Sequence, residues 1–204
     1  MLLFSQIQKH GDNFSYVVAD SETREAVVVD SSYNSDVLIK TIKAQNIQLK
    51  YIISTHGHSD HTVGNNTLQQ VYKTAKTVAH KQTKNQTDLR VHDGDNISIG
   101  KVSIQVIYTP GHTPDGICLL IDNQKLLTGD TLFIGECGRT DLPGGDPKQL
   151  YQSLFQKILT LSDTIEVYPG HNYGVKPSST IGYERKTNYV LQPRTQEEFI
   201  QFMD

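Results

Sequence analysis

The first part of the chain consists of short segments in which apolar residues alternate with polar ones or run together. Polar stretches with Gly, Asp and Asn separate these segments, and such residues favour tight turns. The pattern predicts three antiparallel strands, at residues 2–8, 14–20 and 26–32. Apolar residues at helical spacing predict a helix at 35–45, with Ser35 as its N-cap. A strand at 49–54 completes a strand–helix–strand order, which indicates a layered α/β fold.

The second part alternates in the same way between strand and helix patterns. Further strands are predicted at 77–80, 96–99, 101–108, 116–122, 125–128 and 165–168, and a polar, turn-like segment at 81–95. Asp146 is expected to cap a helix over 147–161 that has Pro147 at its first position. From about 176 to 204 we expect a tail with two short helices, near 180–190 and 195–203, packed on the rest of one domain.

The stretch Thr55-His56-Gly57-His58-Ser59-Asp60-His61 follows directly after one of the predicted strands. It places three imidazoles and a carboxylate within six consecutive residues, in what should be a loop. Imidazole and carboxylate ligands suit Zn, Fe, Mn or Cu, and no Cys is near. The stretch therefore predicts a metal site.

Other predicted strands also end in residues of the ligand type beside Gly or Pro. With the first stretch they make seven candidates: His56, His58, Asp60, His61, His112, Asp130 and His171. Loops at strand ends converge in layered α/β proteins, so we expect these side chains to meet. Seven such groups are enough for two metal ions.

Composition narrows the class of protein further. The 204 residues suffice for one domain with a sizeable core. A net charge of −3 without a Lys/Arg cluster gives no footprint for nucleic acid. No apolar run approaches the length of a membrane helix, and the start does not have the pattern of a signal peptide. With two widely spaced Cys, these features predict a cytoplasmic protein without membrane partners.

Four blocks of this sequence, in this order, resemble the metallo-β-lactamase superfamily: Thr55 to His61, Pro110-Gly111-His112-Thr113, Thr128-Gly129-Asp130 and Pro169-Gly170-His171. The resemblance implies the four-layer αββα fold. It also implies a first metal on His56, His58 and His112, and a second on Asp60, His61 and His171. Asp130 would bridge the two metals.

Two branches of that superfamily are the most similar. The segment 129–139 and His171-Asn172-Tyr173 resemble glyoxalase II, in which the matching tyrosine helps to hold glutathione. Glyoxalase II also has a C-terminal helical domain, for which 204 residues leave no room. The segment 137–141 and the tail resemble the iron persulfide dioxygenases. In that family only the residues matching His56, His112 and Asp130 bind iron.

Our main hypothesis is a hydrolase of small acyl thioesters with two Zn²⁺ ions and a metal-bound hydroxide as nucleophile. Metal binding lowers the pKa of water from 15.7 to about 7, and Asp60 and Asp130 are the expected catalytic carboxylates. The alternative is a persulfide dioxygenase with one Fe²⁺, acting on glutathione persulfide, and a lactonase is a minor third hypothesis. Arg139 and Tyr173 are the candidate substrate-binding residues, and a homodimer is possible on the resemblance.

Overall fold

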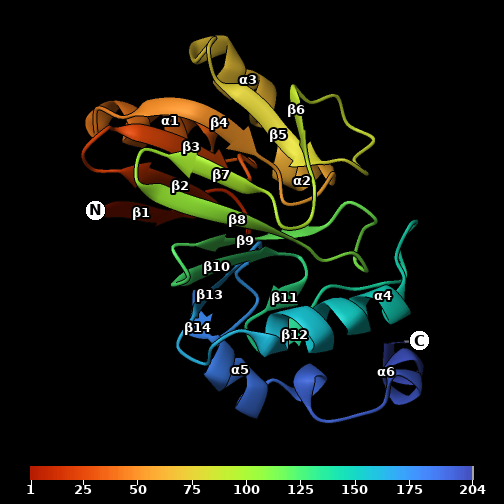
Figure 1. The fold of residues 1–204 in the computed structure, drawn as a ribbon. Coiled ribbons are helices and arrows are strands. Elements are labelled where there is room, and N and C mark those ends of the chain that lie inside the picture. Colours follow the sequence, from red (N-terminus) through yellow and green to blue (C-terminus); the bar gives the residue numbers. More distant parts are fainter. Residues whose placement is uncertain (204) are drawn as a thin grey trace.

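Two six-stranded sheets face each other, and helices cover the outer face of each sheet (Figure 1). This arrangement comes from a computed structural model, which describes residues 1–203. The order of layers is helix, sheet, sheet, helix. The predicted four-layer αββα fold is therefore confirmed.

The first sheet is built from the N-terminal part of the chain, with its strands in sequence order. Its strands are β1 (Leu2–Ile7), β2 (Ser15–Asp20), β3 (Glu25–Val29), β4 (Gln48–Ile53), β5 (Lys76–His80) and β6 (Leu89–Val91). The first three pair antiparallel, as predicted, and β3 to β6 pair parallel. The carboxyl ends of β3, β4 and β5 therefore meet at one edge of the sheet.

The second sheet has the order β14-β13-β10-β9-β8-β7. Its strands are β7 (Asn96–Ile99), β8 (Val102–Tyr108), β9 (Ile117–Ile121), β10 (Lys125–Gly129), β13 (Glu166–Pro169) and β14 (Ser179–Thr180). A separate two-stranded hairpin, β11 (Leu132–Phe133) with β12 (Glu136–Cys137), follows β10. The hairpin packs beside the second sheet and reaches toward the C-terminal helices (Figure 1).

Helices form the two outer layers. On the first sheet lie α1 (Ser35–Ala44), α2 (Ser59–Thr62) and α3 (Asn65–Val71). The second sheet is covered by α4 (Pro147–Tyr151), η1 (Gln152–Lys157), η2 (Ile158–Thr160), α5 (Ile181–Thr187), η3 (Tyr189–Leu191) and α6 (Gln196–Met203). No helix within residues 1–203 is long and apolar enough to cross a bilayer.

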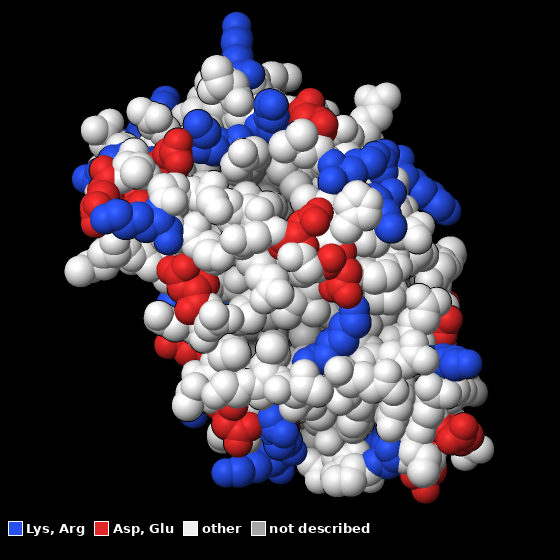
Figure 2. Space-filling view, in the orientation of Figure 1, with Lys and Arg blue, Asp and Glu red and all other residues white. Residues whose placement is uncertain are grey.

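Three buried apolar clusters hold the four layers together. The alternation along β2 shows why. Tyr16 and Val18 point into the cluster between the sheets, whereas Val17 and Ala19 point into the cluster under α1 and α3. The third cluster lies between the second sheet and the C-terminal helices. On the outer surface, acidic and basic side chains are interspersed over most of the face shown in Figure 2.

Several local predictions need correction. The N-cap of α1 is Asn34, not Ser35, and the Asn34 side chain does not cap the helix. Its amide instead donates to the Asn13 carbonyl and its oxygen accepts from the Lys9 amide, which ties two loops together. The segment 81–95 contains the short strand β6, which pairs with β5. The hairpin of β11 and β12 was not predicted, because its two-residue strands are too short to show a pattern.

The helix predicted over 147–161 begins as expected, because the Asp146 carboxylate accepts from the amides of Lys148 and Gln149. Its continuation is a π-helix followed by a 3₁₀ turn rather than an α-helix. Apolar spacing does not distinguish these forms, since Leu150, Leu154 and Ile158 stay on the buried side in either case.

Candidate metal centre

All seven predicted ligand-type side chains lie at one end of the sandwich. His56 and His58 stand in the loop after β4, and Asp60 and His61 lie in the one-turn helix α2 that follows. From the second sheet come His112 after β8, Asp130 after β10 and His171 after β13. The two sheets thus contribute to one site, as the position of the residues after strands predicts.

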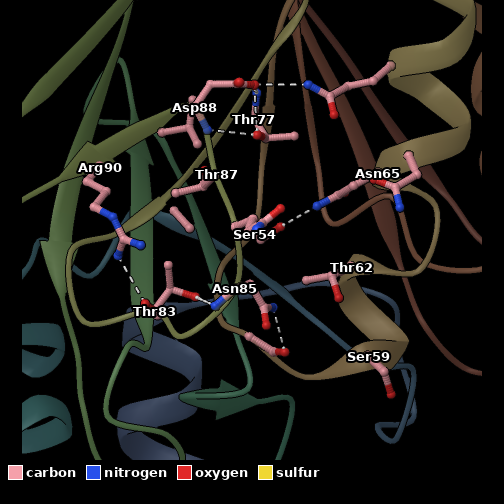
Figure 3. Close-up of a pocket in the computed structure, with 16 residues that line it drawn as sticks. Ser54, Ser59, Thr62, Asn65, Thr77, Thr83, Asn85, Thr87, Asp88 and Arg90 are labelled. Atoms are coloured by element: carbon pink, nitrogen blue, oxygen red, sulfur yellow. Dashed lines mark hydrogen bonds between the residues drawn. The ribbon is translucent and has the colours of Figure 1, made fainter.

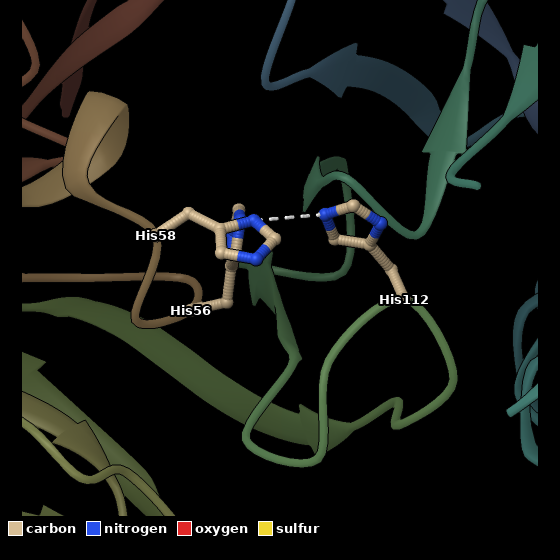
Figure 4. Close-up of side chains that lie close together, drawn as sticks. All are labelled: His56, His58 and His112. Atoms are coloured by element: carbon tan, nitrogen blue, oxygen red, sulfur yellow. Dashed lines mark hydrogen bonds between the residues drawn. The ribbon is translucent and has the colours of Figure 1, made fainter. Parts of the chain in front are cut away.

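The ligand atoms form three overlapping groups, and within each group they lie within 4.8 Å of one another: His56/His58/His112, His56/His61/Asp130 and Asp60/His61/His171. Figure 4 shows His56 and His58 reaching from one loop toward His112 on another. The distance from His58 Nδ1 is 3.0 Å to His56 Nε2 and 3.1 Å to His112 Nε2. The expected convergence is therefore present, while the role of each residue remains a prediction.

Contacts at the outer ring nitrogens fix the orientation of the imidazoles. His112 Nδ1 lies 2.8 Å from the carbonyl oxygen of Arg139, which accepts its proton. His112 Nε2 is consequently left with a lone pair that points into the centre. His56 is oriented in a similar way by the Thr55 hydroxyl, 3.2 Å from its Nδ1.

Asp30 and Asn13 support the site and were not predicted. Asp30 Oδ2 lies 2.9 Å from His61 Nδ1 and accepts from the Thr55 hydroxyl at 2.7 Å, while Oδ1 accepts from the Thr55 amide. The Asn13 amide donates to Asp60 Oδ2 at 3.0 Å and lies beside His171. Asp30 fell inside the predicted strand 26–32, which in the structure ends at Val29, and neither Asp30 nor Asn13 gave a signal of its role.

The pKa values of several histidines in the centre are shifted by burial and by the neighbouring carboxylates and imidazoles. Burial by itself would lower the pKa of His61, but the carboxylates of Asp130 and Asp30 outweigh it and raise that pKa well above its usual value. Burial likewise opposes the shift at His171, whose bonds to Asp130 and Asp60 raise its pKa to about 10. At His56, burial followed by the neighbouring His61 lowers the pKa well below the usual value.

The buried carboxylate of Asp130 provides a test of whether a cation fits. Its Oδ1 is buried and makes no hydrogen bond of good geometry, and its polar neighbour is His61 Nε2 at 3.3 Å; such an atom is costly unless a charge compensates it. Gly170 packs against this oxygen so closely that a Cβ there would lie 2.4 Å from it and 2.8 Å from His61 Cε1. The donor set of imidazoles and carboxylates suits a zinc or an iron ion. The residues therefore fit a metal.

A cavity of about 390 Å³ opens beside His112 and Asp130. The predicted substrate-binding residues Arg139 and Tyr173 both line it. The Tyr173 ring stacks on His171, with 4.8 Å between the ring centres. The structure thus places both residues next to the candidate metal centre, and their contact with a substrate remains a prediction.

A second, larger cleft of about 770 Å³ lies behind the metal loop (Figure 3). Hydroxyl and amide side chains line most of it, and many of them bond to one another. The Asn85 amide donates to the Gly57 carbonyl at 2.9 Å, and the Asn65 amide donates to the Ser54 hydroxyl at 3.1 Å. The first bond holds the backbone between His56 and His58, and the second anchors the Ser54 side chain just before the metal loop.

A two-sheet sandwich with histidines and carboxylates gathered at its strand ends defines a class of metal-dependent enzymes. The family profile described as the metallo-beta-lactamase superfamily matches residues 10–171, and the chain belongs to this superfamily as one of its enzymes.

Individual relatives are similar over most or all of the chain. The mouse (Mus musculus) persulfide dioxygenase ETHE1, mitochondrial, is 34% identical over 100% of this chain and 81% of its own length. The crystal structure of ETHE1 from Myxococcus xanthus covers 98% of this chain and 89% of its own, with 32% identity and a TM-score of 0.93. PksB of Bacillus subtilis (strain 168), a probable polyketide biosynthesis zinc-dependent hydrolase, is 31% identical over 93% of this chain and 86% of its own length.

Proposed function

We propose that this protein is an iron-dependent persulfide dioxygenase. The observation that carries the proposal is the similarity to the two ETHE1 proteins over the whole chain, including the C-terminal tail. This similarity favours the persulfide dioxygenase, the alternative hypothesis from the sequence, over the main hypothesis of a thioester hydrolase.

The geometry of three side chains supports this choice. The residues proposed to hold iron are His56, His112 and Asp130. Asp130 Oδ2 lies 3.5 Å from His112 Nε2 and 4.0 Å from His56 Nε2. Two histidines and one carboxylate on one face form the ligand set of many iron(II) oxygenases, and bound iron would offer open positions to dioxygen and to the substrate sulfur.

The reaction balances with dioxygen and water as co-reactants. A persulfide RSSH, O₂ and H₂O give the thiol RSH, sulfite and two protons; the outer sulfur loses four electrons, which dioxygen accepts. The protein residues bind and orient the substrate. Burial raises the pKa of Tyr173 to about 12, so its hydroxyl keeps its proton at neutral pH and can donate a hydrogen bond in the cavity. Arg139 holds His112 through its backbone carbonyl, and its side chain lines the same cavity.

Metal analysis together with oxygen uptake tests the proposal. Protein purified without oxygen or added metal should contain about one iron per chain and should consume oxygen when a persulfide is added. His56→Ala should lose both iron and activity. His171→Ala, on the opposite side of the centre, should retain most of the iron. Iron-loaded protein that consumes no oxygen with any persulfide would rule the proposal out.

A zinc-dependent thioester hydrolase is the second candidate. It is favoured by the complete group of Asp60, His61 and His171, which a site with one iron leaves unused, and by the similarity to PksB. This candidate requires about two zinc ions per chain and hydrolysis of a thioester at neutral pH. In that case His56→Ala and His171→Ala should be equally inactive.

A further inference from the structure

The cavity beside the candidate metal centre has a mainly aromatic wall. Phe133 and Tyr173 stand on one side, with 5.0 Å between their ring centres. The tail supplies Tyr189, Phe202 and Met203. Tyr189 is 50% exposed and Phe202 43% exposed, so much of their ring surface is open to a ligand. A bound molecule would therefore bury apolar surface against the tail.

Arg139, which lines this cavity, and Arg194, which lies next to it, already have partners. The Arg139 guanidinium forms two parallel bonds to the Asp141 carboxylate, at 2.6 and 2.5 Å. Arg194 lies over the Phe202 ring, 4.2 Å from its centre, and donates to the Tyr189 carbonyl at 2.8 Å. Two parallel bonds between Arg and a carboxylate are a strong arrangement. A substrate carboxylate would therefore have to compete with Asp141 for the Arg139 guanidinium, in a pair that is more than half exposed to water.

The remaining charge in the lining is negative. Glu136 lines the cavity and accepts a hydrogen bond from the Tyr189 hydroxyl. Within residues 1–203 the cavity has no basic lining residue other than Arg139. A substrate carboxylate placed in this cavity would be repelled by Glu136 and would find the Arg139 guanidinium already paired with Asp141, so the loss of its hydration would be poorly compensated.

We propose that the substrate of this enzyme has an apolar, uncharged thiol portion, such as an aryl or alkyl group, and that glutathione with its two carboxylates is disfavoured. This inference rests on the proposed function for the reacting sulfur. Beyond the proposed function, the inference specifies the chemical character of the group that carries the reacting sulfur.

Binding of thiols to the iron-loaded protein tests the inference without depending on turnover. We expect phenylmethanethiol to bind at least about tenfold more tightly than glutathione by calorimetry, which corresponds to about 1.4 kcal/mol. Equal or tighter binding of glutathione, or binding of neither thiol, would overturn the inference. Oxygen uptake, measured separately with the two persulfides, tests the proposed reaction. Its failure would leave the binding result interpretable.

A substitution that frees Arg139 gives a second test. Asp141→Asn removes the charge that engages the guanidinium, so glutathione should bind about two- to fivefold more tightly while phenylmethanethiol is unaffected. Asp163→Asn is the matched control, because Asp163 is an exposed partner of Arg185 and does not line the cavity. No gain for glutathione in Asp141→Asn would contradict the proposed effect of the Arg139–Asp141 pair on substrate choice.

Discussion

At the scale of single residues, an oxygen atom holds the outer nitrogen of several imidazoles in the candidate metal centre. The pairs are His56 with Thr55, His61 with Asp30, His112 with the Arg139 carbonyl and His171 with Asp12. Each contact restricts the ring and its tautomer, so the inner nitrogen stays directed at the centre. The orientation of the candidate ligands is thus set by residues that would not touch the metal.

Asp30 is the most buried of these supports and leads to a stability prediction. Asp30→Asn keeps the shape but weakens the bonds to His61 and Thr55, so unfolding should become easier by about 1.5–3 kcal/mol, the usual range for hydrogen bonds to a charged group. Chemical denaturation measures this value. Asp36→Asn should have a much smaller effect, because this exposed carboxylate and its partner Lys9 are screened by water. Equal effects of the two substitutions would contradict the prediction.

Protons should compete with metal at this centre. In the metal-free protein the pKa of His171 is raised to about 10, so the ring carries a proton at neutral pH. A cation held by the group of Asp60, His61 and His171 requires a neutral His171 ring, so binding to that group must release the proton. Affinity for a divalent ion should therefore rise between pH 6 and 8 and fall as the pH is lowered. Calorimetry in buffers of different ionisation enthalpy reports the release; identical enthalpies in all buffers would refute it.

Sequence alone located the seven candidate ligands because their residue types are rare and each follows an apolar strand. It did not reveal Asp30 or Asn13. Asp30 and Thr55 are 25 positions apart, and Asn13 and Asp60 are 47 apart, so only the folded chain brings each pair together. The residue type of an Asp or Asn in a loop does not indicate such a long-range contact.

At the scale of elements, the helix α5 and the hairpin of β11 and β12 form one unit. Glu184 of α5 is fully buried and accepts from the Gly135 amide at 2.8 Å, in the turn of the hairpin. Asn188 donates to Glu184 and to the Glu136 carbonyl at 3.0 and 3.2 Å. The tail therefore holds the hairpin that carries Phe133 into the cavity beside the candidate metal centre.

Loss of this connection should affect substrate binding more than turnover. Glu184→Gln should destabilise the protein by about 1.5–3 kcal/mol and raise KM with a smaller change in kcat, because the hairpin wall would shift. Thermal unfolding and steady-state kinetics check both parts. Glu197→Gln, at an exposed position in α6, is the control and should behave as the original protein. An unchanged KM in Glu184→Gln would show that the hairpin keeps its place unaided.

Element boundaries were predictable to within one residue in the first two strands, whereas the third, predicted over 26–32, ends at Val29. They were less predictable where tertiary contacts decide. The N-cap of α1 falls at Asn34, whose side chain does not cap the helix because it bonds to neighbouring loops. The strand β6 forms because it can pair with the edge of β5. The polar sequence of the segment 81–95 gives no indication of this pairing.

At the scale of the whole molecule, the tail is part of the core. Phe199 of α6 is fully buried and its ring meets Tyr151 and Phe155, with centres 5.6 and 5.8 Å away. Its cluster continues under the second sheet to residues of β9 and β10. We therefore predict that the tail does not unfold separately from the rest of the domain.

The substitution Phe199→Ala tests whether the tail unfolds together with the rest of the domain. The cavity it leaves should cost about 3–5 kcal/mol, and unfolding should remain a single transition with the same midpoint by circular dichroism and tyrosine fluorescence. Phe202→Ala, at a half-exposed ring on the same helix, should cost much less. Two separated transitions would mean that the tail is an independent unit.

The candidate ligands are divided between the two sheets, and this division has a consequence for how the protein matures. His56, His58, Asp60 and His61 are synthesised long before His112, Asp130 and His171, and none of the three groups that combine both sheets exists until the second sheet has packed on the first. Metal capture is then a late event on the ribosome or after release.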